Sequence, residues 1–239
     1  MKKQERIEKA ERFIENLKDL ESLERSHKKF LEEEPRDFIY KLVSKKVKED
    51  MPPEEISDYL QLFLQVWNMA MYQRLPKSIK RQMHSQILEA YKNNIEKIQR
   101  FPEKIEEINL NKNGDLMIQL FNNFAAYESI KYTGASKLLH LLKPNLFPIW
   151  DQYIKNFYHR LHSKEEEKKL GGECYFNFMG QTKEITLSFS EEEKSKLSYM
   201  CGKNTIIRII DEHNYVNITL PIQKEKEQER KLKEQKNSE

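Results

Sequence analysis

Apolar side chains recur every three or four residues along most of the first 162 positions, which is the spacing of one face of an α-helix. The pattern predicts helices over residues 3–32, from Asp37 to about 47, over 54–74, over 76–100, over 133–142, and from Asp151 for about ten residues. Residues 111–114 predict a turn, after which the helical period continues to Tyr127. Helix 54–74 is apolar on most of its circumference, so we expect it at the centre of the core. The first 162 residues therefore predict one mainly α-helical domain.

The pattern changes beyond that domain. A run of charged residues at 163–169 is typical of a solvated connection. Residues 174–178 and 184–190 alternate between apolar and polar as strands do, which predicts a β-hairpin. We therefore expect a small C-terminal α+β appendage over residues 163–222.

Helical signals return near the end of the chain. Ser190 followed by three glutamates predicts the start of a helix, and Gly202 is a plausible end for it. A further helix is expected over 205–213. Residues 223–239 contain almost only Lys, Glu and Gln, so we expect a charged tail that is disordered or a frayed helix.

Composition narrows the functions open to the chain. The net charge is only +3, so any contact with nucleic acid must come from local clusters of basic side chains. The two cysteines, Cys174 and Cys201, have neither the spacing of a zinc site nor that of a disulfide framework. We therefore expect reduced thiols, no metal and no cofactor. The N-terminus lacks the apolar region of a secretion signal, and apolar stretches are too short to span a membrane, so a cytoplasmic location is expected.

Residues 127–154 carry the strongest functional indication, with the sequence YESIKYTGASKLLHLLKPNLFPIWDQYI. The pattern predicts a tight connection, a short apolar helix, an extended segment, and then Asp151 at the start of another helix. The small residues Gly134 and Ala135 permit close helix packing. The apolar residues before Asp151 are expected to hold it on a rigid and largely dry platform.

This segment resembles the core of the helix-hairpin-helix DNA glycosylase superfamily. In that family a Gly–hydrophobic–Gly hairpin leads into a helix containing an alanine, and a catalytic aspartate follows two apolar residues about sixteen positions later. Ala135 and Asp151 have that spacing here, and Ile149 and Trp150 precede the aspartate. The resemblance covers about 28 of the 239 residues. It implies a multi-helical glycosylase-like fold and a role in DNA repair.

The hairpin departs from the family pattern. Ser129 and Lys131 replace the two glycines on either side of Ile130, so a charge contact from Lys131 would replace part of the backbone contact to a DNA phosphate. Thr133 occupies the position of the nucleophilic lysine found in bifunctional members. Schiff-base chemistry at that position is therefore excluded.

The resemblance then implies a monofunctional glycosylase, a hydrolase that breaks the N-glycosidic bond of a base flipped out of double-stranded DNA. Asp151 is the expected catalytic carboxylate, which would stabilise the cationic sugar. The residues expected to hold the DNA backbone are Ser129, Ile130, Lys131, Thr133 and Lys137. The aromatic residues expected to wall the base pocket are Tyr127, Tyr132, Trp150 and Tyr153.

Simpler interpretations stand beside this one. Aspartate is a favoured helix N-cap, a role compatible with catalysis, and His140 is expected to be a satisfied buried histidine. The chain as a whole is alternatively a non-catalytic module that binds DNA or a protein through the same scaffold, or an unrelated helical protein. Geometry distinguishes these interpretations. A glycosylase needs Asp151 to face an open cleft bordered by Lys131, Lys137 and aromatic side chains.

Overall fold

The computed structural model describes residues 12–48, 50–159 and 171–236, and all regular structure within these ranges is helical. The elements are, in chain order, α2 (Leu20–Glu33), α3 (Asp37–Lys46), α4 (Pro53–Trp67), α5 (Met69–Arg74), α6 (Lys77–Lys92), α7 (Ile95–Gln99), the 3-10 turn η1 (Ile105–Glu107), α8 (Leu110–Ala125), α9 (Lys131–Leu142), α10 (Gln152–His159), α11 (Gly171–Leu187), α12 (Glu191–Met200), α13 (Ile206–Asn214), the π-helical turn η3 (Tyr215–Thr219) and α14 (Leu220–Lys236). The prediction of a mainly α-helical protein is confirmed.

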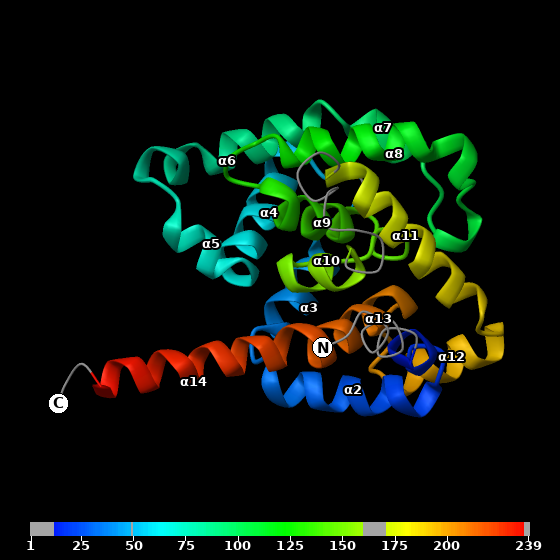
Figure 1. Ribbon diagram of the computed structural model, residues 1–239. Helices are drawn as coiled ribbons and strands as arrows, with labels where there is room; N and C mark the ends of the chain where they lie inside the picture. Colours follow the sequence, from blue (N-terminus) through cyan, green and yellow to red (C-terminus); the bar gives the residue numbers. More distant parts are fainter. Residues whose placement is uncertain (1–11, 49, 160–170, 237–239) are drawn as a thin grey trace.

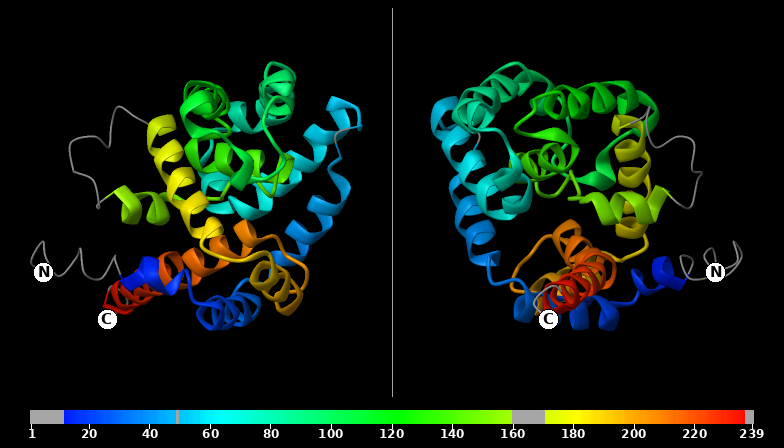
Figure 2. Two further views of the ribbon diagram at one scale, coloured as in Figure 1. Left: turned by 90° about the vertical axis from the view of Figure 1, so that its right-hand side faces the viewer. Right: turned by 60° about the vertical axis from the view of Figure 1, so that its left-hand side comes forward.

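The helices form two layers (Figure 1). One layer holds the middle of the chain, in which α9 packs against α8 and α4, and α8 also packs against α11. The other layer joins the two ends of the described chain, because α2 lies along α13 and also contacts α12 and η3. Figure 2 shows this layer from two further sides, with the N-terminal and C-terminal helices together at one end of the molecule. The chain therefore starts in one layer, forms the other layer with its middle part, and returns to the first layer at its C-terminal end.

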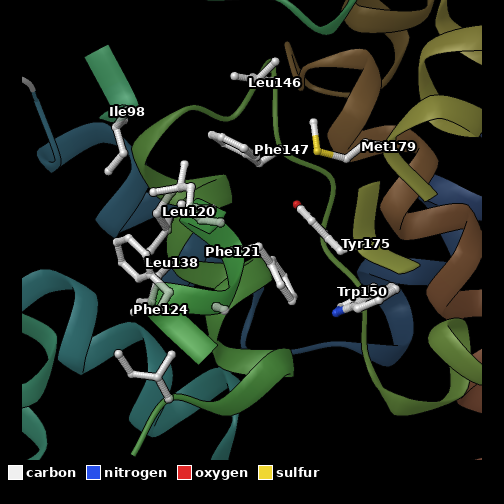
Figure 3. Close-up of a cluster of buried hydrophobic side chains, with 14 of the residues drawn as sticks. Ile98, Leu120, Phe121, Phe124, Leu138, Leu146, Phe147, Trp150, Tyr175 and Met179 are labelled. Atoms are coloured by element: carbon white, nitrogen blue, oxygen red, sulfur yellow. The ribbon is translucent and has the colours of Figure 1, made fainter. Parts of the chain in front are cut away.

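Aromatic side chains fill the core of the larger layer (Figure 3). Phe121 of α8 stacks on Tyr175 of α11 with ring centroids 4.2 Å apart, and Trp150 meets both rings edge-on. Edge-on and offset stacked pairs are the favoured geometries of aromatic rings. Helix α4 buries Leu60 and Phe63 in the same core, as expected of the central helix. The extended segment before Asp151 is therefore anchored by Trp150.

The predicted β-hairpin is wrong. Residues 174–178 lie within α11, and 184–190 begin in the last turn of that helix and run past its end. Tyr175, Phe178, Met179 and Thr182 are buried at the three- and four-residue spacing of a helix. Over windows of five to seven residues, the two short segments also fit an alternating pattern, so the period alone favoured strands.

The predicted turn at 111–114 is also wrong, since these residues lie in the first turns of α8. Asn109 caps the helix by accepting a hydrogen bond from the Lys112 N–H at 3.1 Å. A β-carbon on Gly114 would lie only 3.2 Å from the ring of Phe176 on α11. Gly114 therefore serves close packing of two helices rather than a turn.

Three helices predicted as continuous are each interrupted in the structure, and the charged tail is helical where the structure describes it. Asp19 begins α2 by accepting from two backbone N–H groups, so the helix expected over 3–32 is interrupted within its described part. Asn68 separates α4 from α5, and Asn94 precedes α7. Of the two alternatives for the charged tail, the structure has the helix: α14 extends through it as far as Lys236. The proposed boundary at residue 162 lies outside the described residues and stays a prediction.

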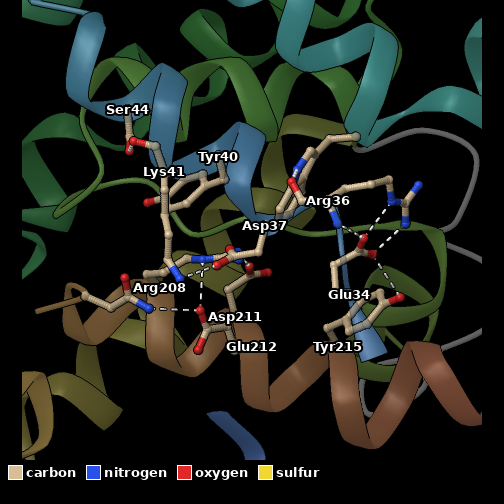
Figure 4. Close-up of polar contacts among 12 residues, drawn as sticks. Glu34, Arg36, Asp37, Tyr40, Lys41, Ser44, Arg208, Asp211, Glu212 and Tyr215 are labelled. Atoms are coloured by element: carbon tan, nitrogen blue, oxygen red, sulfur yellow. Dashed lines mark hydrogen bonds and ion pairs between the residues drawn. The ribbon is translucent and has the colours of Figure 1, made fainter. Parts of the chain in front are cut away.

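A fully buried arginine joins the two layers (Figure 4). The guanidinium of Arg208 on α13 pairs with Asp37 of α3 at 3.0 Å, with Asp211, and with Glu212 at 3.2 Å. The same group lies 4.3 Å from the ring centre of Tyr40 and 4.8 Å from that of Trp67. A buried charge is tolerated only when its neighbours compensate it, and here both layers supply them.

We expect Arg208→Met to lower the free energy of unfolding by about 3–5 kcal/mol, because it leaves buried carboxylates without their counter-charge. Urea denaturation followed by circular dichroism measures this. The matched control is Arg25→Met, whose guanidinium is 67% exposed beside Asp19 and Glu21. The control should cost less than about 1 kcal/mol. Equal effects of the two substitutions would show that the buried cluster does not hold the layers together.

Candidate functional site: a carboxylate in an interlayer cleft

A cleft of about 870 Å³ opens between the two layers. Its walls come from the α2–α3 connection, from α5 and the end of α4, from α9 and α10, and from α13 through the first turns of α14. Its polar and charged lining residues include Glu34, Arg36, Arg74, Lys131, Thr133, Lys137, Asp151, Asp211, Tyr215 and Lys226. Residues distant in the sequence thus meet around one space.

Asp151 is half-buried on the wall of this cleft and also caps α10. Its Oδ1 accepts hydrogen bonds from the backbone N–H groups of Tyr153 at 2.7 Å and Ile154 at 2.9 Å. Aspartate at this position satisfies N–H groups that the first helical turn leaves unpaired. The N-cap interpretation is confirmed, and the cap leaves the carboxylate in the lining of the cleft.

The second carboxylate oxygen has a partner from the other layer. The hydroxyl of Thr219 in η3 donates to Asp151 Oδ2 at 2.6 Å. Asp151 therefore faces the cleft with both oxygens already accepting hydrogen bonds, one set from its own helix and one from the C-terminal segment. Its place in the lining lets the carboxylate meet a ligand in the cleft, and its hydrogen bonds fix its orientation.

The hairpin before α9 keeps an unusual backbone conformation at Lys131. Its φ is +54°, in the left-handed region that side chains with a β-carbon rarely adopt. This is the position where the glycosylase pattern has its second glycine. Ser129 and Ile130 are buried, whereas Lys131 is exposed at the edge of the cleft. Of these three residues, only Lys131 presents a side chain that can meet a phosphate.

Lys137 lies one helical turn beyond Thr133 and is buried in the cleft wall, only 7% exposed. Its Nζ donates to the backbone carbonyl of Trp67 at 2.6 Å. Burial lowers the pKa of Lys137 to about 8, although the nearby carboxylates of Asp151 and Asp211 oppose the shift. The expectation that Lys137 holds a DNA phosphate at the surface does not fit this burial.

Only two of the four aromatic residues expected around the base pocket line the cleft. Tyr132 and Tyr153 line the cleft, and Lys226 donates to the Tyr153 hydroxyl at 3.1 Å. Trp150 is a core residue packed on Phe178, and Tyr127 lies against Glu89 of α6 and Asn93, the residue that follows α6, instead. His140 is the satisfied buried histidine that the sequence suggested, bound to the hydroxyl of Tyr40 and the carbonyl of Phe147. Burial, followed by the charge of Arg208, lowers the pKa of His140 to about 3.

Several cleft residues were not identified from the sequence. Glu34 accepts from Arg36 Nε at 2.6 Å and from the Tyr215 hydroxyl at 3.2 Å. Asp211 lines the same space, and burial raises its pKa to about 7 against the opposing charge of Arg208. In the sequence, Glu34 and the following proline indicated only the end of a helix. Neither Asp211 nor Tyr215 carries a local signal, since α13 is placed by tertiary packing.

The comparisons with known proteins found no match: no protein-family model, no curated protein and no solved structure is significantly similar to this chain. Among the described residues, no helix is both long enough and apolar enough to cross a bilayer. The same part of the chain has no group of three His, Cys, Asp or Glu residues placed to hold a metal ion.

The lowered pKa of Lys137 makes a prediction about stability. Below pH 8 the folded protein must bury a charged amine, and between pH 8 and 10.5 the unfolded chain binds the proton that the folded chain has lost. The free energy of unfolding of the wild type, minus that of Lys137→Met, should therefore rise between pH 8 and 10.5 by on the order of 3 kcal/mol. Urea denaturation of both proteins across this range measures the difference. A difference independent of pH would mean that Lys137 is not buried as a charge.

Proposed function

We propose that this chain is a DNA-binding protein of the helix-hairpin-helix base-excision type, acting as a monofunctional DNA glycosylase with Asp151 as its catalytic carboxylate. One observation carries the proposal. Asp151, sixteen residues after Ala135, lies at the start of a helix and on the wall of a cleft bordered by Lys131, Tyr132 and Tyr153. The spacing comes from the sequence, whereas the cleft comes from the fold.

The hairpin backbone supports the same function. A left-handed residue at the start of α9 is the conformation for which the glycosylase pattern uses glycine, and Lys131, the first residue of α9, adopts it at the cost of about 1–2 kcal/mol. Strain of this kind persists where surrounding structure demands it and is frequent at functional sites. An exposed ammonium at the mouth of the cleft also attracts a phosphate backbone.

The charges around the cleft suit a bent duplex at its mouth. Arg74, Lys131 and Lys226 are exposed lining residues on three different elements. The carboxylates of Asp151 and Asp211 lie deeper, and Asp211 is almost fully buried. Phosphates would meet the outer cations, and a sugar carrying positive charge would meet the inner carboxylates.

The proposed chemistry is hydrolysis. As the bond between the base and C1′ breaks, its electron pair leaves with the base, and positive charge develops on the sugar. The anionic side chain of Asp151 stabilises that charge, and water then adds to C1′ and gives up a proton, which neutralises the departing base. Thr133 supplies no amine, so the base leaves the deoxyribose without a covalent intermediate between the sugar and that residue.

The second candidate function is a non-catalytic DNA-binding module built on the same scaffold. The observation that favours it is that both oxygens of the Asp151 carboxylate already accept hydrogen bonds, from its own helix and from Thr219. In this case Asp151 would serve as a helix cap and as a tie between the layers. Duplex binding without release of any base is its expected behaviour.

Replacement of Asp151 by asparagine should abolish base release while leaving the fold intact. Asparagine is as good an N-cap as aspartate, and its amide NH2 can donate to the Thr219 hydroxyl where the carboxylate accepted from it, so the substitution mainly removes charge. A panel of duplexes, each with one damaged or mismatched base, is incubated with excess protein, and released base is measured by mass spectrometry. We expect the single-turnover rate of Asp151→Asn to fall at least about a hundredfold with unchanged duplex affinity.

The matched control is Asp58→Asn, an exposed aspartate on α4 that pairs with His84. It should retain the wild-type rate. Equal activity of the wild type and Asp151→Asn would exclude catalysis by Asp151. Binding of the duplexes by the wild type, without release of any base, would favour the non-catalytic module.

Lys131→Ala should weaken duplex binding to a similar extent for all sequences and reduce the slope of log affinity against log salt by about one. The matched control is Lys203→Ala, because Lys203 is also exposed and also left-handed, with φ +66°, but lies between α12 and α13. Both substitutions keep the β-carbon and therefore leave the left-handed strain in place, so a difference between them reports the lost ammonium at each position. An identical salt dependence in the two variants would remove Lys131 from the DNA-binding surface.

A further inference from the structure

The C-terminal segment reaches the cleft through a change of helical period. Between α13 and α14, residues 215–219 form a π-helical turn, in which the Leu220 N–H donates to the carbonyl of Tyr215, five residues earlier. Such turns are rare, and many of them occur at functional sites. Here the turn contributes two side chains, Tyr215 and Thr219, to the surroundings of Asp151 and Glu34.

A proline accounts for the position of this turn. Pro221 is the second residue of α14, has no N–H to donate, and its ring would collide with the carbonyl of Asn217 in a continuous α-helix. Widening the preceding turn by one residue moves that carbonyl aside without breaking the helix. The π-turn is therefore a local consequence of one residue in the sequence.

The wider turn changes which residues share a face. In an α-helix each step of four residues advances by about 40°, so two steps place Thr219 about 80° from Asp211. With the i to i+5 hydrogen bond of the π-turn, four residues complete slightly less than one turn instead. Thr219 thus returns to the face that already carries Asp211 and Tyr215, both of which line the cleft.

We propose that Thr219 is a positioning residue, which the π-turn before Pro221 brings next to Asp151, behind the wall of the cleft, to hold its carboxylate in a fixed orientation. The hydrogen bond is short, 2.6 Å, and links the wall formed by α10 to the wall formed by the C-terminal helices. The inference rests on the proposed function, because Asp151 needs positioning only if it acts on a substrate. The hydroxyl of Thr219 donates to the carboxylate, so Thr219 acts through Asp151 and not on a reacting atom.

The experiment compares Thr219→Val with Thr219→Ser, since valine keeps the shape and loses the hydroxyl, whereas serine keeps the hydroxyl. The matched control is Thr182→Val, another buried threonine whose hydroxyl donates to its own helix at Phe178. Water can replace the lost donor at the half-buried Asp151, so the fold should survive. The side-chain carboxyl ¹³C signal of Asp151, assigned by its loss in Asp151→Asn, reports the contact directly.

We expect Thr219→Val to shift this carboxyl signal, and Thr219→Ser and Thr182→Val to leave it near the wild-type position. Pro221→Ala should give the same shift as Thr219→Val, because an unbroken α-helix turns Thr219 away from Asp151. An unshifted signal in Thr219→Val overturns the contact. A shift there but none in Pro221→Ala overturns the role of the π-turn.

The kinetic arm uses the duplex on which the wild type releases a base. Thr219→Val should lower the single-turnover rate on the order of tenfold with unchanged duplex affinity, and Thr219→Ser should restore it. Equal rates for Thr219→Val and the wild type overturn the positioning role. If the wild type releases no base from any duplex, the proposed function is overturned, whereas the carboxyl signal still decides whether Thr219 holds Asp151.

Discussion

The structure depends on the buried guanidinium of Arg208. Removing such a group from water is costly, and the cost is offset only because carboxylates and aromatic faces surround it. Asp37 comes from the layer that holds the middle of the chain, whereas Asp211 and Glu212 follow Arg208 on α13. Two of the three carboxylates therefore come from the helix of Arg208 itself, and docking of the layers adds the third, Asp37. Docking of the layers and full compensation of this buried charge are thus coupled.

The same docking creates the cleft. Because both ends of the described chain build one layer, the walls of the cleft combine Glu34, Asp151 and Tyr215 from three distant segments. Asp211 belongs both to the Arg208 cluster and to the cleft lining, so the interaction that joins the layers also adjusts the electrostatics of the site. Burial raises the pKa of Asp211 to about 7 and lowers that of Lys137 to about 8, which leaves two groups that titrate near neutral pH.

Two backbone features that are unfavourable locally lie at this cleft. Lys131 adopts a left-handed conformation without being glycine, and Pro221 forces a π-turn into a helix that would otherwise run on. Each has a consequence at the site: the first presents an exposed ammonium at the mouth, and the second places a hydroxyl on Asp151. Asp151 itself combines a structural and a chemical position, since capping α10 and facing the cleft use the same carboxylate.

The sequence by itself determined the mainly helical class, the buried α4, and Asp151 as a helix cap, because these follow from local periodicity and capping chemistry. It also indicated that Lys131, Tyr132 and Tyr153 lie around the same site as Asp151, because short connections join the segments that carry them. Only the tertiary structure showed that α11 is a helix and that Gly114 serves packing, since a short alternating segment fits either period. The burial of Lys137 and Trp150, the displacement of Tyr127, and the approach of Thr219 to Asp151 were likewise decided by packing. Those contacts join residues up to 70 positions apart, and no local pattern encodes such pairings.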